Sequence, residues 1–358
     1  MEQPFRYSGQ RAIVSRRTAF LGGFGALALA ASVGFAVYLG DGLQWRLSPV
    51  TLRFYLASRE HNALRSDCLH GSGQRSTAAS LCTSSAPETG NRYDIVVWGD
   101  SHGDALFPAF AAIGERHGLA ARQATKRGCP PLLGAERVDE GRRAKRFGTS
   151  SCEKYNDGML QELTKGQRPS LVILVARWSM YTETTTDVAG GRRIFMVDDE
   201  NQNYDVETSR KVVSRALGRT IDAVTALGIP VLLVGQSPEF FQDPNICFVE
   251  RAMLRRDARD CLAQPRAIAD QRLRVSEEIL SKTANGRSGA TYVSLAAILC
   301  DKEICRAMDN DQPLYEDKNH LDLAGAFFVG RALSETPDLE RLFMPQSSTY
   351  ASIHHFRN

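Results

Sequence analysis

A long uncharged stretch at residues 19–39 constrains this chain more than any other feature of its sequence. At about 1.5 Å of rise per residue, a helix of that length covers the roughly 30 Å hydrocarbon core of a membrane. No second stretch is as long and as apolar, which excludes a multi-pass membrane architecture. The sequence therefore predicts a mostly soluble protein with one membrane-spanning helix near its start.

The charges beside this stretch predict its orientation. Four arginines precede it and Asp41 follows it, so the positive-inside rule places residues 1–18 in the cytoplasm and everything after Asp41 outside. A cleaved signal peptide is the alternative, because the paired arginines before the apolar run are similar to a twin-arginine signal and residues 28–30 could form a cleavage site. The apolar run continues past that site, which favours an uncleaved anchor.

The eight cysteines all lie after the apolar stretch, and an even number confined to the exported part indicates disulfides in an oxidising compartment. Pairing in sequence order closes the shortest loops and predicts the bridges 68–82, 129–152, 247–261 and 300–305. The alternative is that one or two of these pairs remain free buried thiols. None of the spacings is C-x-x-C and no histidine cluster accompanies them, so the sequence predicts no metal site.

Beyond residue 91, short apolar runs alternate with amphipathic stretches. Strands that are apolar throughout and separated by helices are typical of a parallel sheet covered on both faces. Such a sheet holds its site at the carboxyl ends of the strands. We therefore expect an α/β fold in three α/β/α layers. The predicted strands are residues 95–98, 171–176, 231–234 and 292–295, and the predicted helices are residues 104–117, 208–227, 266–284 and a last one after Leu321.

These patterns divide the chain into five parts. The predicted parts are a cytoplasmic N-terminus (1–18), a transmembrane helix (19–39), a stalk or linker with a disulfide-closed loop (40–90), the main domain (91–340) and a C-terminal tail (341–358). A net charge of +3 is too small for a dedicated nucleic-acid binder. The basic cluster at residues 142–146 is interpreted as a solvated loop, with contact to an anionic glycan or membrane surface as the alternative.

The first predicted strand ends in Gly99, Asp100 and Ser101, and a predicted helix follows. A serine on such a strand-to-helix turn has an exposed hydroxyl and a backbone N–H near the positive end of the helix. Both suit a nucleophile, because the N–H can stabilise the oxyanion that forms during acyl transfer. The alternative is an ordinary helix N-cap, for which Ser and Asp are both common.

Two histidines have a carboxylate three residues earlier: His70 with Asp67, and His320 with Asp317. The first pair precedes every predicted strand and is poorly placed to reach the serine. The second pair follows the last predicted strand, where Asp317 could orient the imidazole and His320 could take the proton of the serine. A turn before a helix is the alternative interpretation of this pair. Glu316 is a less favoured substitute for the aspartate.

These two motifs resemble the first and last sequence blocks of the SGNH (GDSL-type) hydrolases and acyltransferases. More narrowly, residues 98–102, 128–132, 176–178 and 320–321 resemble the periplasmic SGNH domain that is fused to membrane acyltransferases of the acyltransferase-3 family, and the resemblance covers roughly residues 90–335. Residues 2–6, the apolar helix and residues 42–47 are similar to the closing segment of that membrane domain. We therefore expect the chain to carry the extracytoplasmic half, without the preceding multi-helix part.

The resemblance implies a role for each matching residue. Ser101 would be the nucleophile, His320 the general base and Asp317 its orienting partner, and the backbone of Gly128 would join that of Ser101 as oxyanion donor. The resemblance departs at one block, because many family members outside this subgroup have G-x-N-D after the next strand.

At that block this chain has Arg177 and Trp178, so the asparagine donor is absent. Arg177 could supply donors in its place. The alternative is that Arg177 and Trp178 shape the wall of the substrate cleft.

The function that the resemblance implies is O-acyl transfer, most simply of acetyl, to a polysaccharide such as O-antigen or exopolysaccharide. A membrane acyltransferase would supply the acyl group, and no cofactor is expected. The same machinery is an esterase if water resolves the acyl-enzyme, and a non-catalytic glycan-binding module is a further alternative. We expect a single-pass protein of the inner membrane with its C-terminal domain in the periplasm.

Overall fold

The structure of the chain is a computed structural model that describes residues 15–71, 95–140, 151–165, 168–184 and 193–344, and the backbone of residues 82 and 83. The predicted basic loop at residues 142–146, the end of the chain after residue 344 and the arginines at positions 6 and 11 lie outside the described residues. The chain divides into two compact units, Met1–Leu52 and Arg53–Asn358.

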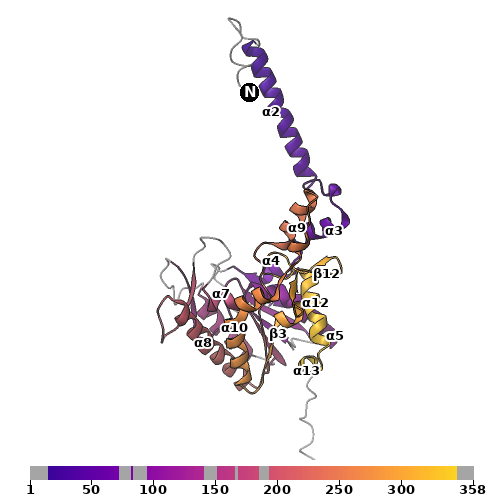
Figure 1. Cartoon of the computed structure of the whole chain (residues 1–358). Coiled ribbons are helices and arrows are strands. Elements are labelled where there is room, and N and C mark those ends of the chain that lie inside the picture. The colour runs from indigo at the N-terminus through magenta and orange to yellow at the C-terminus, as the bar shows by residue number, and fades with distance from the viewer. Residues whose placement is uncertain are drawn as a thin grey trace, which may run out of the picture. The chain divides into compact units, whose positions relative to one another are not determined.

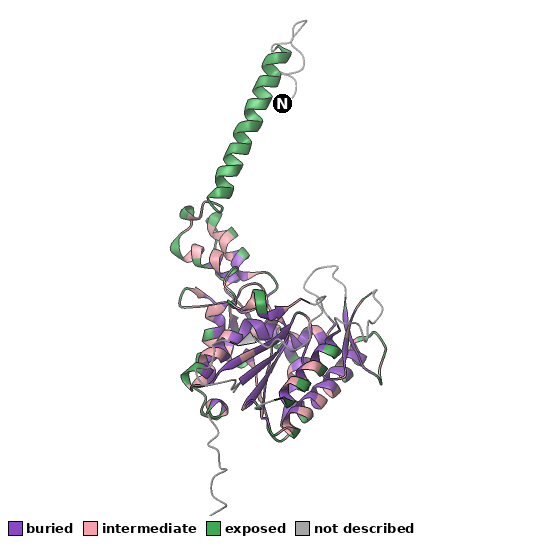
Figure 2. Ribbon diagram, turned by 180° about the vertical axis from the view of Figure 1, so that it is seen from behind, coloured by how far each residue is buried: buried purple, intermediate pink, exposed green. Residues whose placement is uncertain are grey.

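The first unit contains α2 (Arg16–Leu39), which among the described residues is the one helix long and apolar enough to cross a membrane. Ser15 caps its N-terminus by accepting a hydrogen bond from the N–H of Thr18 at 3.2 Å. No residue of α2 is buried, so the helix is exposed along its whole length (Figure 2). An apolar surface on all sides of a helix suits a lipid environment. The short helices η1 (Gln44–Arg46) and α3 (Pro49–Ala57) follow.

The second unit is built around a sheet of seven strands. Six of them run parallel in the order β1-β4-β3-β6-β8-β10, and β2 pairs antiparallel with β4. These strands are β1 (Leu69–His70), β2 (Cys82–Thr83), β3 (Ile95–Gly99), β4 (Ala121–Lys126), β6 (Leu171–Val175), β8 (Val231–Val234) and β10 (Ala290–Val293). Three two-stranded ribbons lie outside the sheet: β5 (Glu136–Asp139) with β7 (Ile194–Val197), β9 (Ala263–Pro265) with β11 (Ile304–Arg306), and β12 (Met308–Asp309) with β13 (Gln312–Pro313).

Helices cover both faces of this sheet, and the strands between them are buried (Figures 1 and 2). Successive residues of a strand point to opposite faces, so in β3 Val96 and Trp98 pack into one core cluster, and Ile95 and Val97 pack into the other. The expected three-layer α/β/α fold is therefore confirmed. The first cluster includes residues of α6 (Cys152–Thr164), α7 (Trp178–Thr182), α8 (Val206–Ala226) and α10 (Arg266–Asn285); the second includes residues of α5 (Ser101–Arg116), α11 (Leu295–Leu299), α12 (Leu323–Ser334), α13 (Pro337–Glu340) and η3 (Arg341–Phe343).

One inner strand of the sheet, β4, is not predicted by the apolar pattern. β4 has the polar sequence ARQATK, and its Gln123, Thr125 and Lys126 are nevertheless buried. Gln123 is satisfied there because its Nε2 donates to Asp104 Oδ1 at 2.8 Å and to Thr125 Oγ1 at 2.7 Å. Asp104 lies on α5 and Thr125 on β4 itself. Because the strand is polar, a search for apolar runs misses it.

The segment before the sheet also contributes more than a linker. α4 (Arg65–Cys68) leads into β1, which pairs with the end of β4. Residues within the predicted stalk at 40–90 therefore add a strand to the edge of the sheet. The remaining elements of the second unit are α9 (Pro244–Met253) and η2 (Arg259–Cys261), between β8 and β9.

Three of the four predicted disulfides are confirmed: Cys129–Cys152, Cys247–Cys261 and Cys300–Cys305. Each bridge joins cysteines that are neighbours in sequence order, as sequential pairing predicts. Cys68 is also disulfide-bonded, while the side chain of Cys82, its predicted partner, lies outside the described residues.

Candidate active site

Ser101 stands on the sharp turn between β3 and α5. Gly99 allows this turn because the chain passes very close to β6: an added Cβ would lie 1.9 Å from the carbonyl oxygen of Val175. Asp100 is the N-cap of α5, and Ser101 is the first residue of the helix. Ser101 thus lies at the carboxyl end of a central parallel strand, where the positive end of a helix dipole begins.

Asp100 ties this turn to the next strand of the sheet. Its Oδ1 accepts a hydrogen bond from the N–H of His102 at 2.8 Å. Its Oδ2 accepts from the N–H of Arg177 at 3.0 Å and from the hydroxyl of Tyr181 at 2.8 Å. Burial raises the pKa of Asp100, and these hydrogen bonds oppose that shift. The predicted nucleophile is therefore held by a buried network that joins the ends of β3 and β6.

Ser101, His320 and Asp317 form a hydrogen-bonded series, called the candidate triad below. His320 Nε2 lies 2.9 Å from Ser101 Oγ, and His320 Nδ1 lies 2.8 Å from Asp317 Oδ2. The other carboxylate oxygen of Asp317 accepts the backbone N–H groups of Asn319 and His320, each at 2.8 Å. The carboxylate is thus oriented toward the imidazole by its own turn.

The electrostatics of this series favour a basic imidazole. Burial disfavours the charged imidazolium, but the hydrogen bond and the charge of Asp317 outweigh it, and the pKa of His320 is raised above its ordinary value. Burial raises the pKa of Asp317, because it disfavours the charged carboxylate. The hydrogen bonds and the charge of His320 outweigh burial and hold the pKa of Asp317 well below its usual range. An ionised carboxylate beside a histidine of raised pKa is the arrangement that a general base requires.

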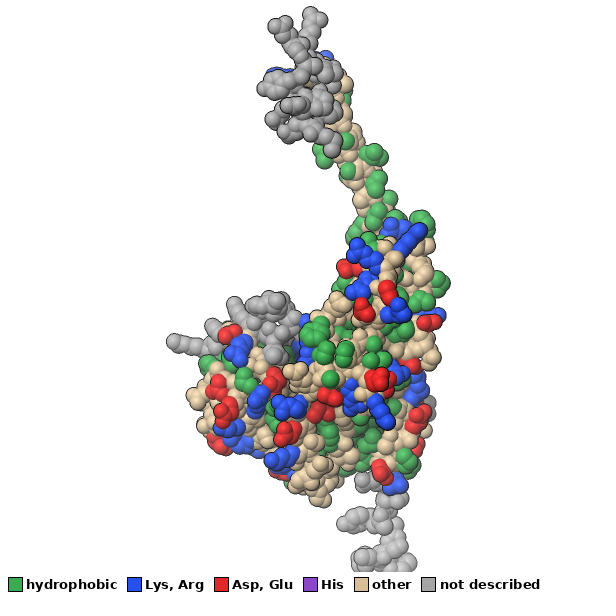
Figure 3. All heavy atoms as spheres, viewed as in Figure 1, with side chains coloured by type: hydrophobic (Ala, Val, Ile, Leu, Met, Phe, Trp, Pro, Cys, Tyr) green, Lys and Arg blue, Asp and Glu red, His purple; other side chains and the backbone are tan. Residues whose placement is uncertain are grey.

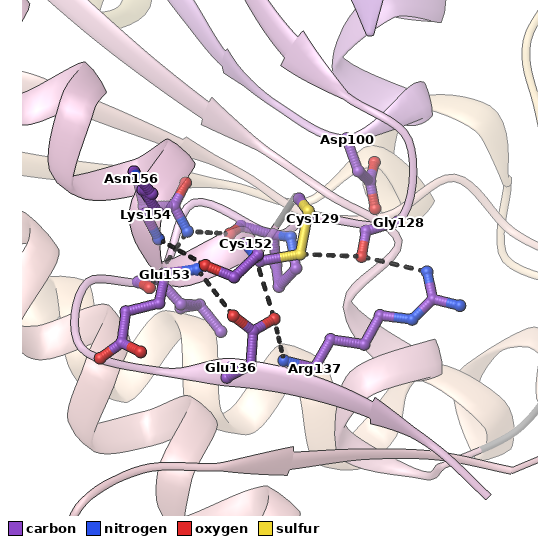
Figure 4. Close-up of a disulfide and its surroundings, with 12 residues drawn as sticks. Asp100, Gly128, Cys129, Glu136, Arg137, Cys152, Glu153, Lys154 and Asn156 are labelled. Atoms are coloured by element: carbon purple, nitrogen blue, oxygen red, sulfur yellow. Dashed lines mark hydrogen bonds between the residues drawn. A yellow bond between two sulfur atoms is a disulfide. The ribbon is translucent and has the colours of Figure 1, made fainter. Parts of the chain in front are cut away.

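Gly128 lies just after β4, which is next to the strand that precedes Ser101, because Gly99 of β3 pairs with Thr125 of β4. Its φ is +64°, a backbone conformation that favours glycine. The carbonyl oxygen of Gly128 accepts a hydrogen bond from Arg137 Nη1 at 3.2 Å (Figure 4). An added Cβ would lie 1.8 Å from that same nitrogen, at the flexible end of the arginine side chain, so the positive φ is the reason that favours glycine here.

The loop after Gly128 is fixed from the side of α6. The disulfide between Cys129 and Cys152 joins the loop to the first turn of that helix (Figure 4). Glu136 accepts the N–H of Cys152 at 3.1 Å and so anchors the same turn. Asn156, one turn later, donates to the carbonyl oxygen of Pro130 at 2.8 Å.

Two backbone N–H groups near this edge of the sheet, those of Ser101 and Gly128, are available as hydrogen-bond donors. Among the described residues, neither the N–H of Ser101 nor the N–H of Gly128 has a hydrogen-bond acceptor. A pair of fixed, unpaired N–H groups from neighbouring loops is what an oxyanion requires.

Arg177 and Trp178, which the sequence places at the cleft, have different environments. The guanidinium of Arg177 forms two hydrogen bonds to the Glu239 carboxylate, at 2.7 and 2.6 Å, and lines a cleft of about 600 Å³. Trp178 is fully buried, and its Nε1 donates to the carbonyl oxygen of Val234 at 2.8 Å. Trp178 belongs to the core cluster that also contains residues of the sheet and of α8, and it is not among the residues that line this cleft.

Sequence reasoning missed a second histidine beside the site. The ring centroid of His102 lies 4.6 Å from that of His320, and His102 Nε2 lies 3.1 Å from Asn319 Oδ1. Burial and the neighbouring charge of His320 hold the pKa of His102 well below its ordinary value. A neutral His102 packs against the turn that carries Asp317 and His320 without adding charge. Its position directly after Ser101 is the signal that could have suggested this role.

Glu316, the substitute considered for Asp317, turns away from the imidazole and pairs with Arg65. Among the described residues, no group of three or more His, Cys, Asp or Glu side chains could hold a metal ion.

Comparison with known proteins places these features in a family context. A family model described as the SGNH domain fused to AT3 domains matches residues 67–335, which is well over half of the chain. The match contains Ser101, Gly128, Arg177, Asp317 and His320. No curated protein matches the sequence.

Two solved structures illustrate the similarity of fold. The periplasmic domain of a lipopolysaccharide acetyltransferase of Salmonella ser. Paratyphi A is 17% identical with a TM-score of 0.51, and the match covers 82% of this chain and 98% of that one. A protein of Bacteroides fragilis NCTC 9343 described as an acylhydrolase is 11% identical with a TM-score of 0.36, covering 74% of this chain and 93% of that one. At such identities the first similarity shows the fold alone, and the second is too low to carry an argument.

Proposed function

This chain belongs to the family of SGNH domains fused to AT3 domains, and on that premise we propose that it is a serine-dependent O-acyltransferase acting on a cell-surface polysaccharide. Acetyl is the simplest acyl group for this reaction. The observation that carries the proposal is the candidate triad: Ser101 Oγ, His320 Nε2 and Asp317 Oδ2 form one continuous hydrogen-bonded series at the carboxyl ends of the parallel strands.

In the first half of the reaction, Ser101 becomes acylated. His320 Nε2 accepts the proton of the Ser101 hydroxyl while Oγ attacks the carbonyl carbon of the acyl donor. Asp317 holds the imidazole in the required tautomer and stabilises the imidazolium that forms. The tetrahedral intermediate then collapses, the imidazolium gives its proton to the leaving group, and an acyl ester remains on Ser101.

The negative oxygen of the tetrahedral intermediate needs donors that are already in place. The N–H groups of Ser101, at the start of α5, and of Gly128, on the loop that the Cys129–Cys152 bridge fixes, are suitable, because neither has another acceptor among the described residues. Fixed donors cost no reorganisation when the charge develops. They would also replace the asparagine donor that this chain lacks at Arg177.

In the second half, a hydroxyl of the polysaccharide gives its proton to His320 and attacks the acyl ester. Its oxygen forms the new ester, and the Ser101 oxygen leaves and takes the proton back from the imidazolium. Water in place of the sugar hydroxyl would make the same intermediate that of an esterase. The outcome depends on how well the site excludes water when the glycan is bound.

The proposal includes a location. We propose that α2 crosses the inner membrane once and that the second unit works in the periplasm. The apolar surface of α2 supports the single span, and the disulfides support an oxidising compartment. A family whose members are fused to AT3 domains supports a membrane acyltransferase as the supplier of the acyl group.

Trapping the acyl-enzyme tests the proposal. The full chain in detergent is mixed with p-nitrophenyl acetate, quenched with acid and digested, and the peptides are weighed by mass spectrometry. We expect acetyl on the peptide that contains Ser101, and a loss of turnover of roughly 10³-fold or more in Ser101→Ala. Ser281→Ala, on α10, is the matched control. Undiminished turnover by a folded Ser101→Ala chain would remove the proposal.

A further inference from the structure

A cleft of about 600 Å³ extends to the turn of the candidate triad, where Lys318 lines it. Its walls come from the loops after β6 and β8, from α10 and from Lys318, which lies within the turn between Asp317 and His320. The wall formed by Phe240 is joined to the turn of the candidate triad, because the N–H of Phe240 donates to the carbonyl oxygen of Lys318 at 2.8 Å. Loops at the carboxyl ends of neighbouring parallel strands are where such folds bind their ligands.

One aromatic side chain of this cleft, Phe241, is largely exposed to solvent. Phe241 is 68% exposed, although most large apolar side chains of the second unit are buried. The guanidinium carbon of Arg272 lies 3.8 Å from the centroid of its ring. Arg272 is itself anchored, since its Nη1 donates to the carbonyl oxygen of Glu239 at 3.0 Å. The cation covers one face of the ring, and the exposed fraction leaves surface for a ligand.

The rest of the lining is mostly polar. Arg177, Ser179, Glu239 and Gln271 present amide, hydroxyl, carboxylate and guanidinium groups. On the face where α10 lies in Figure 1, acidic and basic side chains are interspersed and not gathered by sign (Figure 3). A lipid chain would need an apolar lining, and a strongly charged polymer would need a surface of one sign. Neither condition is met.

A sugar unit matches both parts of this lining. Its C–H face is apolar and flat enough to lie on an aromatic ring, while its rim carries hydroxyl groups that exchange hydrogen bonds with polar side chains. We propose that the cleft is the acceptor subsite, in which one sugar unit of the polysaccharide stacks on Phe241 and thereby brings a neighbouring hydroxyl to the acyl ester on Ser101. This inference rests on the proposed function and names the residues that select its acceptor.

The test compares a reaction that needs a glycan with one that does not. Phe241→Ala, Phe241→Trp and the wild-type full chain are expressed in cells whose surface polysaccharide is acetylated through this protein, and O-acetyl content is measured by proton NMR. The same purified chains are assayed with p-nitrophenyl acetate, which has no sugar. Phe327→Ala is the matched control, because Phe327 is 43% exposed on α12 outside the cleft.

We expect the ratio of polysaccharide acetylation to ester turnover to fall about tenfold in Phe241→Ala, as loss of one central aromatic contact predicts. Phe241→Trp should keep the ratio, and Phe327→Ala should not change it. An unchanged ratio in Phe241→Ala, whether both activities stay at the wild-type level or fall equally, would overturn the assignment of this cleft as the acceptor subsite. Failure of the proposed function has a different signature, because the wild-type chain itself would then show no turnover that depends on Ser101.

Discussion

Arg65 Nη1 lies 2.6 Å from Glu316 Oε1, and Arg65 Nε lies 2.6 Å from Asp104 Oδ2. Asp104 is in the first turn of the helix that begins at Ser101, and Glu316 is the residue before Asp317. One guanidinium from the segment before the sheet therefore joins the two ends of the candidate triad, which are more than two hundred residues apart in the chain. Burial disfavours the charged guanidinium, but its two carboxylate partners outweigh this and raise the pKa of Arg65.

Replacing Arg65 with methionine should destabilise the second unit. The change leaves the fully buried Asp104 and the largely buried Glu316 without their cation, and breaking a buried ion pair from one side costs about 3–5 kcal/mol. Urea unfolding of the full chain in detergent, followed by tryptophan fluorescence, measures the loss. Arg53→Met is the control, since Arg53 is exposed and bonds a backbone oxygen. A loss no larger than that of the control would contradict the bridging role.

The pH dependence of turnover should report His320. The imidazole acts as a base only when it is neutral, so kcat/KM is expected to fall as the pH drops through the raised pKa of His320. The acidic limb should therefore lie above pH 6.5, the ordinary value for histidine. In Asp317→Asn the stabilising charge is gone, so the limb should move to lower pH and the plateau should fall roughly 10³–10⁴-fold. Superimposable acidic limbs in the two proteins would show that another group titrates.

Loss of the Cys129–Cys152 disulfide should reduce stability and turnover more than loss of the Cys300–Cys305 disulfide. The first bridge spans 23 residues and the second spans 5, so loss of the longer loop's bridge should cost on the order of 1 kcal/mol more in the chain-entropy model. It should also lower kcat, because it fixes the loop that carries Gly128. Urea unfolding and ester turnover of Cys129→Ser with Cys152→Ser, compared with Cys300→Ser with Cys305→Ser, measure both effects. Equal kcat values in the two double variants would argue against a role of Gly128.

The chain by itself should not acetylate polysaccharide. Cytoplasmic thioesters do not reach the periplasm, and the single helix α2 offers no channel through which to move an acyl group. Expression in a host without any membrane acyltransferase of this kind should therefore yield turnover of p-nitrophenyl acetate but no acetylated surface glycan, as measured by proton NMR. Acetylated glycan in that host would mean that the donor comes from the exported side.

Much of the sheet could be predicted from local pattern. The runs at residues 171–175 and 231–234 are apolar throughout because both faces of a central parallel strand are covered. A continuous apolar run is therefore a local sequence pattern from which such a strand can be predicted. The D-x-x-H turn is also a local device, since Asp317 and His320 orient each other through their own backbone. The sequence likewise predicted three bridges, because short loops close most readily.

The tertiary structure alone decided where polar residues could be buried. Gln123 can be buried in β4 because Asp104 accepts its hydrogen bond from another element, and the indole N–H of Trp178 can be buried because the carbonyl oxygen of Val234 accepts from it. Arg65 meets Glu316 only after the segment before the sheet has packed against the loop that carries the candidate residues Asp317 and His320. A polar side chain can be buried without a large cost only where it finds a hydrogen-bond partner. When that partner comes from a distant segment, no periodic pattern or fixed spacing in the sequence indicates the pair.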